Sequence, residues 1–293
     1  MPWLQLRIQT TPNEAQAIEK AMLSVGASAV TLEDNEDQPI FEPELGETPL
    51  WNHTRVTGLF DADIDTAKTL QRVNQFYRKP IESSHWHVLE DKDWEREWEK
   101  NYHPIQCGDN MWICPSWIAP PNPHAVNLML DPGLAFGTGT HPTTFMCLEW
   151  LAKQKTNGLD VIDYGCGSGI LGIAALLLGA NSAQGIDIDP QALIATKNNA
   201  VGNQLSEDSF PVALPQATPN KQYDMMLANI LAGPLVELAP TLLSLMKPKA
   251  SICLSGILAT QKEALIDAYK HEIHFTDIKQ QDEWVCLAGE KIT

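Results

Sequence analysis

A glycine-rich segment in the middle of the chain, Val161-Ile-Asp-Tyr-Gly-Cys-Gly-Ser-Gly-Ile-Leu-Gly172, places the strongest constraint on the fold. An apolar strand runs into a glycine turn that opens a helix, and the next strand leads into Gly185-Ile-Asp-Ile-Asp-Pro190. In open α/β sheets, this order of strand, turn, helix, strand and acid holds a nucleoside at the carboxyl edge. We therefore predict an α/β, Rossmann-like domain with a doubly wound sheet that binds a nucleoside cofactor.

The residues of this segment have distinct expected roles. Gly165, Gly167 and Gly169 lack Cβ atoms, so the backbone can turn sharply and a ligand can lie directly on main-chain N–H groups. Asp187, after the second strand, is placed to accept hydrogen bonds from both ribose hydroxyls. Asp163, at the tip of the first strand, is expected to organise the N–H groups of the loop or to meet a cationic ligand.

Two classes of enzyme fit the glycine pattern. Gly167-x-Gly-x-x-Gly172 satisfies the dinucleotide fingerprint, which leaves a nicotinamide-dependent oxidoreductase as an alternative. That fingerprint begins immediately at the strand end, whereas here the strand ends at Asp163 and Gly165 already lies in the turn. The register favours Asp-x-Gly-x-Gly-x-Gly, which resembles the first motif of class I S-adenosylmethionine-dependent methyltransferases.

Length, charge and cysteine content limit the class of protein. A chain of 293 residues predicts two domains. The chain begins without a signal peptide and has no apolar run of about 18 residues, so we expect a cytoplasmic protein with no membrane contact. The net charge of −17 argues against direct nucleic-acid binding. The 6 cysteines are scattered with no C-x-x-C pair, which indicates reduced thiols and no metal site.

The first 90 residues predict a small α+β domain. Apolar periodicity indicates six elements in the order βαββαβ, over residues 4–9, 12–25, 28–33, 54–60, 64–78 and 84–89. This is the order of a ferredoxin-like, split βαβ unit. His85 and His87 have no cysteine or carboxylate partner, and the unit carries no catalytic constellation. We therefore interpret residues 1–90 as a substrate-recognition domain.

A charged segment, residues 91–103, follows with Trp94 and Trp98 on one helical face, which predicts a helical linker. Residues 104–293 then form the cofactor domain. Strands and helices alternate from Leu159 onward, as a doubly wound sheet requires. The last two strands, at 274–279 and 283–289, are too close together for a crossover helix and predict an antiparallel hairpin.

Two more segments supply candidate catalytic residues. Asp131-Pro-Gly-Leu-Ala-Phe-Gly-Thr-Gly-Thr-His-Pro-Thr-Thr144 suits a lid that offers hydroxyls and an aromatic wall, Phe136. His141 is either a proton acceptor or a structural residue at the helix start before Pro142. Asn229 ends a strand at the carboxyl edge, where it either serves the active site or caps the next helix.

Together, Phe136-Gly-Thr-Gly-Thr-His-Pro-Thr-Thr144, Asp163-Tyr-Gly-Cys-Gly-Ser-Gly169, Gly185-Ile-Asp-Ile-Asp-Pro190 and Ala228-Asn-Ile-Leu-Ala-Gly-Pro234 resemble the bacterial methyltransferases of ribosomal protein L-eleven (L11). The resemblance covers essentially the whole chain. It implies S-adenosylmethionine as cofactor, L11 as protein substrate, and methylation of lysine side-chain amines and the N-terminal α-amine up to the trimethyl state. It also implies cofactor contacts at Thr144, Gly165, Asp187 and Asn229, and we expect a monomer.

The chemistry expected of such a site is in-line methyl transfer to a neutral amine held at near-attack distance. A lysine with an ordinary pKa of about 10.4 must first lose a proton, and no residue is an obvious strong base, so water is an acceptable proton acceptor. We assign Asn229 and the loop from Phe136 to His141 to orientation of the reactants. A third hypothesis is a non-catalytic adenosylmethionine-binding module that docks on the ribosome.

Overall fold

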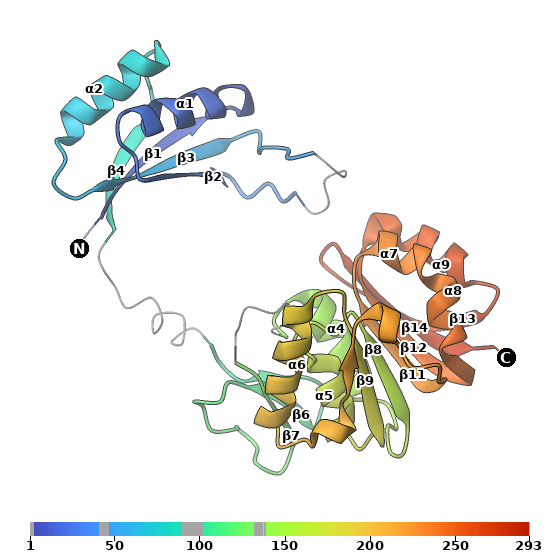
Figure 1. The fold of residues 1–293 in the computed structure, drawn as a ribbon. Coiled ribbons are helices and arrows are strands. Elements are labelled where there is room, and N and C mark those ends of the chain that lie inside the picture. The colour runs from blue at the N-terminus through green and yellow to red at the C-terminus, as the bar shows by residue number, and fades with distance from the viewer. Residues whose placement is uncertain (1–2, 41–46, 90–101, 132–136, 138, 293) are drawn as a thin grey trace. The chain divides into compact units, whose positions relative to one another are not determined.

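The computed structural model describes residues 3–40, 47–89, 102–131, 137 and 139–292, and the chain divides into two units, Met1–Glu99 and Lys100–Thr293 (Figure 1). The N-terminal unit has one hydrophobic core and the C-terminal unit has two. Among the helices in these ranges, none combines the length and the hydropathy that a membrane span needs. The predicted linker at 91–103 lies almost entirely outside the described residues.

The N-terminal unit has the predicted βαββαβ order. Its elements are β1 (Trp3–Thr10), α1 (Pro12–Ser24), β2 (Ala29–Asp34), β3 (Thr54–Asp61), α2 (Thr66–Tyr77) and β4 (Ser84–Leu89). The sheet order is β2-β3-β1-β4 with every neighbouring pair antiparallel, which is the ferredoxin-like arrangement.

Side-chain periodicity explains why this unit closes. Leu6 and Ile8 alternate with polar residues along β1 and are buried. They meet Ile18 and Met22, which lie one turn apart on α1. Asp65 caps α2 by accepting the Lys68 N–H at 3.1 Å.

The C-terminal unit is built on a seven-stranded sheet in the order β10-β9-β8-β11-β12-β14-β13. Its strands are β8 (Asp160–Tyr164), β9 (Ser182–Ile186), β10 (Val212–Ala213), β11 (Tyr223–Asn229), β12 (Met246–Leu258), β13 (Ile273–Gln281) and β14 (Trp284–Lys291). Strands β9, β10, β11 and β12 all run parallel to β8. Strand β14 is antiparallel to both of its neighbours, β12 and β13. The predicted C-terminal hairpin is therefore confirmed.

Helices cover both faces of this sheet (Figure 1). They are α4 (Pro142–Leu151), α5 (Ile170–Leu177), α6 (Pro190–Gly202), α7 (Ala232–Glu237), α8 (Ala239–Ser244) and α9 (Lys262–Tyr269). Consecutive strand residues point into different cores: Val161 packs with α4 and α5, whereas Ile162 packs with α7, α8 and α9. A strand buried on both faces needs a continuous apolar sequence, as β8 and β11 have.

A small third sheet leads into the C-terminal unit. It consists of β5 (Ile105–Gln106), β6 (Met111–Cys114) and β7 (Val126–Met129). The side chain of Asn203, at the end of α6, bonds both the N–H and the carbonyl of Met129 at 2.7 Å. This anchors the start of the segment that leads from Asp131 to His141.

Strand β8 lies between β9 and β11, so the chain reverses its direction of sheet growth at β8. In doubly wound sheets, ligands bind at the carboxyl ends of the strands beside such a switch point. The turn after β8, the residues after β9 and the end of β11 therefore meet at one edge of the sheet.

Candidate functional site

The glycine turn after β8 has the conformation that its composition predicts. Gly165, Gly167 and Gly169 have φ of 78°, 54° and 79°, in the left-handed region that other residues rarely adopt. The N–H groups of Gly165 and Cys166 both donate to the carbonyl of Ile186, at 2.7 and 3.0 Å. The turn is thus fastened to the end of the neighbouring strand β9.

Asp187 lies directly under this turn. Its Oδ2 accepts the Gly167 N–H at 2.9 Å, and its Oδ1 accepts the Asp189 N–H at 2.9 Å. Each carboxylate oxygen can accept a second hydrogen bond, and the side chain is only half-buried. The carboxylate is therefore fixed by the backbone while it keeps acceptor capacity for a ligand.

Polar residues of α6 hold the other side of the turn. The Thr196 hydroxyl donates to the Gly167 carbonyl at 3.0 Å, and the Asn199 amide donates to the Ser168 carbonyl at 2.8 Å. These bonds fix the carbonyls of the turn from this side. Its N–H groups at Gly165, Cys166, Gly167 and Gly169 also donate within the protein, so the turn offers a ligand its Cβ-free backbone surface and not a row of free N–H groups. Sequence analysis did not single out Thr196 or Asn199, although both lie on the helix that follows Asp187.

Asp163 is buried at 1% exposure and its Oδ2 accepts the N–H of Gly172, in α5, at 2.9 Å. Burial raises the pKa of this carboxyl to about 7, an effect that the Gly172 N–H opposes and the nearby charge of Asp187 reinforces. Of the two roles expected for Asp163, its side chain therefore has the geometry of an organiser of the strand-to-helix junction.

Asn229 ends β11 and its side-chain amide donates to the Thr144 hydroxyl at 3.0 Å. Thr144 is fully buried in the first turn of α4, whereas Asn229 is half-buried. Helix α7 begins only at Ala232, with Leu231 at its N-cap position and no side-chain cap. The capping alternative for Asn229 is therefore not what the structure has.

The backbone after Asn229 is held tightly between two glycines. A Cβ on Gly165 would lie 2.1 Å from Cγ2 of Ile230, and a Cβ on Gly256 would lie 2.3 Å from the Ile230 carbonyl oxygen. Gly256 also has a φ of 83°. These close approaches fix where β11 ends relative to the glycine turn, and no motif in the sequence indicated the role of Gly256.

His141 occupies the N-cap of α4. Its Nδ1 lies 2.8 Å from the Thr143 hydroxyl and accepts the Thr143 N–H at 3.4 Å. Its ring packs edge-on against Trp284 with centroids 5.0 Å apart, and burial lowers the pKa of the imidazole. These contacts agree with the structural alternative for His141 at the helix start.

The segment before His141 is tied to the glycine turn where the structure describes it. The Ser168 hydroxyl donates to the Gly137 carbonyl at 2.6 Å. Phe136, the expected aromatic wall, lies outside the described residues. Gly139 packs so closely on Ile113 that a Cβ there would lie 2.4 Å from Cδ1 of that residue.

Three apolar side chains are exposed where β9, β10 and β11 end. Ile188 directly follows Asp187 and is 83% exposed, Leu231 is 53% exposed, and Leu214 follows β10 at 38% exposed. Such exposure at the mouth of a ligand edge provides an apolar surface that a planar base can cover. The turn, Asp187 and these residues together fit an adenosine group.

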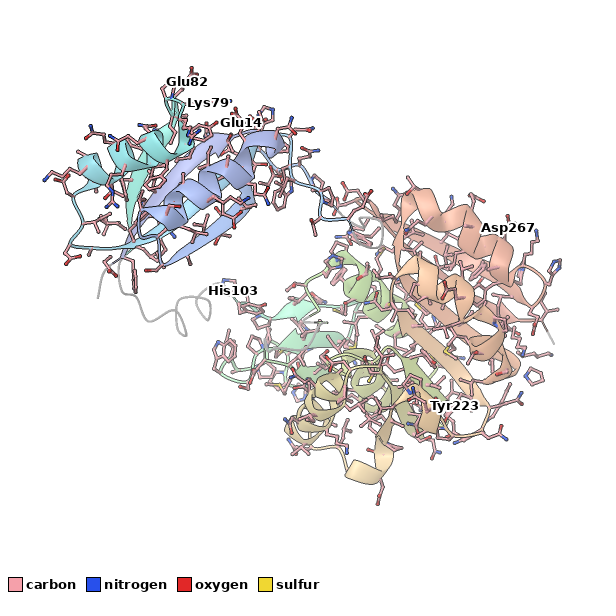
Figure 2. The ribbon with its side chains drawn as sticks, turned by 45° about the horizontal axis from the view of Figure 1, so that its top comes forward. Glu14, Lys79, Glu82, His103, Tyr223 and Asp267 are labelled. Carbon is pink, nitrogen blue, oxygen red and sulfur yellow. The ribbon has the colours of Figure 1, made fainter. Side chains whose placement is uncertain are left out.

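The N-terminal unit contains a separate pocket of about 600 Å³ at one end of its sheet. Glu14 and Lys79 form an ion pair of 2.5 Å across it, and Figure 2 shows Glu82 beside them. The hydrogen bond from Lys79 lowers the pKa of Glu14.

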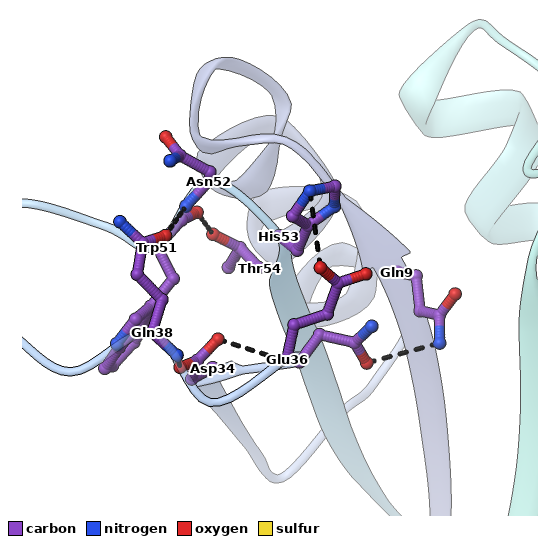
Figure 3. Close-up of polar contacts among 9 residues, drawn as sticks. Gln9, Asp34, Glu36, Gln38, Trp51, Asn52, His53 and Thr54 are labelled. Carbon is purple, nitrogen blue, oxygen red and sulfur yellow. Dashed lines mark hydrogen bonds and ion pairs between the residues drawn. The ribbon is translucent and has the colours of Figure 1, made fainter.

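The pocket is also lined by His53 and Glu36, which lie 3.5 Å apart (Figure 3). The Gln38 side chain accepts the Asn52 N–H at 2.9 Å and so joins the two ends of the long β2–β3 connection. The pocket therefore has three carboxylates, from Glu14, Glu36 and Glu82, against one lysine and one histidine.

Comparison with known proteins shows which family the chain resembles over its whole length. A family model described as Ribosomal protein L11 methyltransferase (PrmA) matches residues 2–292. Proteins named ribosomal protein L11 methyltransferase from Saccharophagus degradans and Cellvibrio japonicus are 67% and 58% identical over 99% of this chain, which covers 100% and 99% of their lengths. A crystal structure titled ribosomal protein L11 methylase, from Lactobacillus delbrueckii subsp. bulgaricus, matches with a TM-score of 0.59 and 31% identity over 66% of this chain and 100% of that one.

Proposed function

The chain belongs to the ribosomal protein L11 methyltransferase family, and on this basis we propose that it transfers methyl groups from S-adenosylmethionine to amines of ribosomal protein L11. It is an S-adenosylmethionine-dependent methyltransferase, and neither the oxidoreductase nor the non-catalytic alternative is favoured. The proposed acceptors are lysine side-chain amines and the N-terminal α-amine, up to the trimethyl state.

We assign the cofactor to the edge formed by the glycine turn. Asp187 would bind the ribose hydroxyls, the Cβ-free backbone of Gly165, Gly167 and Gly169 would line the cofactor, and Ile188 and Leu231 would cover the base. S-adenosylmethionine, when bound, supplies an electrophilic methyl group on a sulfonium. The observation that supports this most directly is the Asp187 carboxylate, which two backbone N–H groups hold in place while it keeps acceptor capacity.

We assign the orientation of the acceptor amine to Asn229. Its Nδ2 is engaged by Thr144, which directs the Oδ1 away from α4 as a hydrogen-bond acceptor. An amine that donates one N–H to this oxygen has its lone pair fixed in direction, which is the requirement for in-line attack. Thr144 therefore acts as a positioning residue for Asn229, and His141 fixes the start of the helix that carries Thr144.

Deprotonation of the amine needs no dedicated base in this scheme. A lysine amine loses its proton more readily when its charged form is desolvated. The described residues around Asn229 include no carboxylate hydrogen-bonded to it. The proton is released to water as the amine enters the site and loses its hydration.

We propose that residues 1–90 recognise the protein substrate, residues 91–103 link the units and residues 104–293 catalyse the transfer. The pocket of the N-terminal unit supports this division, because its three carboxylates suit a lysine-rich, cationic segment. The net charge of −17 would attract the same cationic segment over longer distances.

The proposed function is tested by incubating the purified protein with isotopically labelled S-adenosylmethionine and purified L11. We expect label on L11 and, by peptide mass spectrometry, mass increases of one to three methyl groups on lysines and on the N-terminal residue. Absence of label on L11, with label on another ribosomal protein in a mixture, would show that the substrate is wrong while the methyltransferase activity stands.

A further inference from the structure

Three cysteines that are far apart in the sequence converge in the C-terminal unit. Cys147 lies on α4, Cys253 on β12 and Cys286 on β14, and their Sγ atoms all lie within 4.8 Å of one another. The sulfurs of Cys253 and Cys286 are 3.5 Å apart. Within the described ranges, no other set of three or more His, Cys, Asp or Glu side chains has this proximity.

The convergence is a consequence of strand register and helix packing. Cys253 lies opposite Ala288 in the antiparallel pair, so Cys286 is its diagonal neighbour on the same face of the sheet. Helix α4 packs on β12 and β14 at this face and brings Cys147 down onto both. All three thiols are buried, at no more than 3% exposure. The spacing of the cysteines along the chain predicted no metal site. Sequence spacing does not reveal which cysteines the sheet register and α4 bring together.

A set of three sulfurs is suited to a metal ion more than to a crosslink. A disulfide uses two sulfurs and would leave the third without a function, whereas a Zn–S bond of about 2.3 Å places two thiolates on one tetrahedral ion roughly 3.8 Å apart. The Cys253–Cys286 separation of 3.5 Å is close to this value, and the other two sulfur pairs lie within 4.8 Å. We propose that Cys147, Cys253 and Cys286 form a three-thiolate site for a thiophilic metal ion, Zn²⁺ in the first instance.

Binding at this site is a proton exchange. Three neutral thiols and one Zn²⁺ give a tris-thiolate complex with one net negative charge and three released protons. Cu⁺, the other ion that thiolates prefer, would leave two net negative charges, which are more costly to bury. The choice of Zn²⁺ over Cu⁺ rests on this difference in charge.

Neighbouring groups complete the environment of the site. The buried Ser255 hydroxyl interacts with Cys147 and donates to the Val285 carbonyl at 3.2 Å, so it offers an oxygen for a fourth position. Lys279 is the cross-strand partner of Cys286, and the charges of Asp277 and Lys279 act on that thiol in opposite directions, Asp277 more strongly.

A small pocket adjoins the cluster on its outer side. It has a volume of about 20 Å³ and is lined by Cys286 together with Glu149 and Lys279, which form an ion pair with each other. An ion that reaches the sulfurs from this side would have to pass this ion pair.

The site lies one layer below the proposed catalytic pair. Thr144 and Cys147 are one turn apart on α4, and Ser255, two residues after Cys253, is the β12 partner of Asn229. An ion that ties α4 to β12 therefore restrains the helix that carries Thr144 against the strand that pairs with the Asn229 end of β11. This consequence rests on the proposed function, whereas metal binding itself does not.

The test compares two matched sets of cysteines. Full-length protein is first reduced and stripped of metal with a chelator. It is then exposed to Zn²⁺, or to Cu⁺ in a parallel experiment, and desalted before its metal content is measured. We expect about one Zn²⁺ per chain in the wild type and in Cys107→Ser, Cys114→Ser and Cys166→Ser, which alter buried cysteines outside the cluster. Cys147→Ser, Cys253→Ser and Cys286→Ser are expected to weaken binding at least 100-fold.

A second measurement keeps the proposal testable if a cluster variant fails to fold. Bound Zn²⁺ in the wild-type protein is expected to slow alkylation of Cys147, Cys253 and Cys286 selectively, as read by peptide mass spectrometry. Zinc binding that is unchanged in all three cluster variants, equal protection of all six cysteines, or no retained metal would each overturn the proposal. If the protein retains no metal and forms a Cys253–Cys286 disulfide, the metal site is refuted and the cluster has a redox role. Preference for Cu⁺ over Zn²⁺ would overturn the choice of ion.

Discussion

The Asn229 side-chain amide and the Thr144 hydroxyl lie 3.0 Å apart and join the end of β11 to the first turn of α4. This contact links residues from two motifs that are 85 positions apart in the chain. It determines which end of the Asn229 amide faces α4, and hence, under the proposed function, which atom the acceptor amine would meet. The first prediction concerns the energetic coupling of these two residues.

Asn229→Ala is expected to lower kcat about 100-fold with little change in the affinity for S-adenosylmethionine, because its proposed work is on the acceptor amine. Thr144→Val keeps the shape but removes the hydrogen bond, and we expect a loss of about 10-fold, with activity largely kept in Thr144→Ser. The double variant should be no slower than Asn229→Ala alone, since Thr144 acts through Asn229. Additive losses in single-turnover kinetics would contradict this positioning role.

Asp187→Ala is expected to weaken S-adenosylmethionine binding by roughly 2 to 4 kcal/mol, because it removes charge-assisted hydrogen bonds to the ribose and the anchor of the Gly167 N–H. Asp189→Ala is the matched control. It removes an equal charge two residues away, at the N-cap of α6, and should change affinity far less. Calorimetry with S-adenosylmethionine and NADH provides the measurement, and tight NADH binding by the wild type would reverse the cofactor assignment.

Gly256→Ala is expected to destabilise the protein by more than about 2 kcal/mol, because the residue has a φ of 83° and its new Cβ would meet the Ile230 backbone. Gly233→Ala is the opposite case: it lies inside α7 with no atom within 4 Å of a new Cβ. That substitution should stabilise the protein by about 0.5 to 1 kcal/mol. Urea unfolding of the two variants tests both signs, and equal midpoints would contradict the packing argument.

Most of the fold follows from sequence periodicity and turn chemistry. The strand at Val161, its glycine turn and Asp187 are local in the chain, so their relationship can be predicted from the order of residues alone. The short strands β5 and β10 could not be predicted, because two residues carry no apolar period.

The remaining features of the site depend on contacts across the sheet. The fit of Gly256 against Ile230 and the hold of Thr196 and Asn199 on the glycine turn arise from neighbouring strands and a helix. The convergence of Cys147 with Cys253 and Cys286 has the same origin. Spacing along the chain does not contain this information, because sheet order and register determine it.

Asp163 is expected to make stability depend on pH. Burial raises the pKa of its carboxyl in the folded state from 3.8 to about 7, so the folded chain binds a proton that the unfolded chain has lost. Its contribution to stability is therefore greatest at low pH and declines as pH rises from about 4 to 7. Asp163→Asn should remove this decline, and the variant should gain stability over the wild type, by an amount on the order of 2 kcal/mol, at pH 8 but not at pH 4.

Asp160, at the other end of β8, provides a control of opposite sign. Lys221, Asn181 and Ser182 hold the pKa of its carboxyl well below the usual value. Its contribution is fully present above the unfolded-state pKa of 3.8 and is lost as pH falls from there toward the folded-state pKa, so Asp160→Asn should destabilise the protein fully at pH 7 and by a smaller amount at pH 3. Denaturation curves of the wild type and both variants from pH 3 to 8 provide the measurement. Parallel pH profiles of stability for the wild type and Asp163→Asn would contradict a raised pKa at Asp163.

The two units are expected to divide recognition from chemistry. A fragment from Lys100 to Thr293 keeps both cores of the C-terminal unit, the glycine turn, Asp187 and Asn229, so it should fold and bind S-adenosylmethionine within about twofold of the full chain. It should lose most of its methyl transfer to L11, because the acidic pocket belongs to the other unit. In the full-length protein, Glu36→Lys with Glu82→Lys should raise KM for L11 and leave cofactor affinity unchanged. Full activity of the fragment on L11 would refute the recognition role, and a fragment that cannot bind cofactor would show that the C-terminal unit depends on the N-terminal unit for its fold.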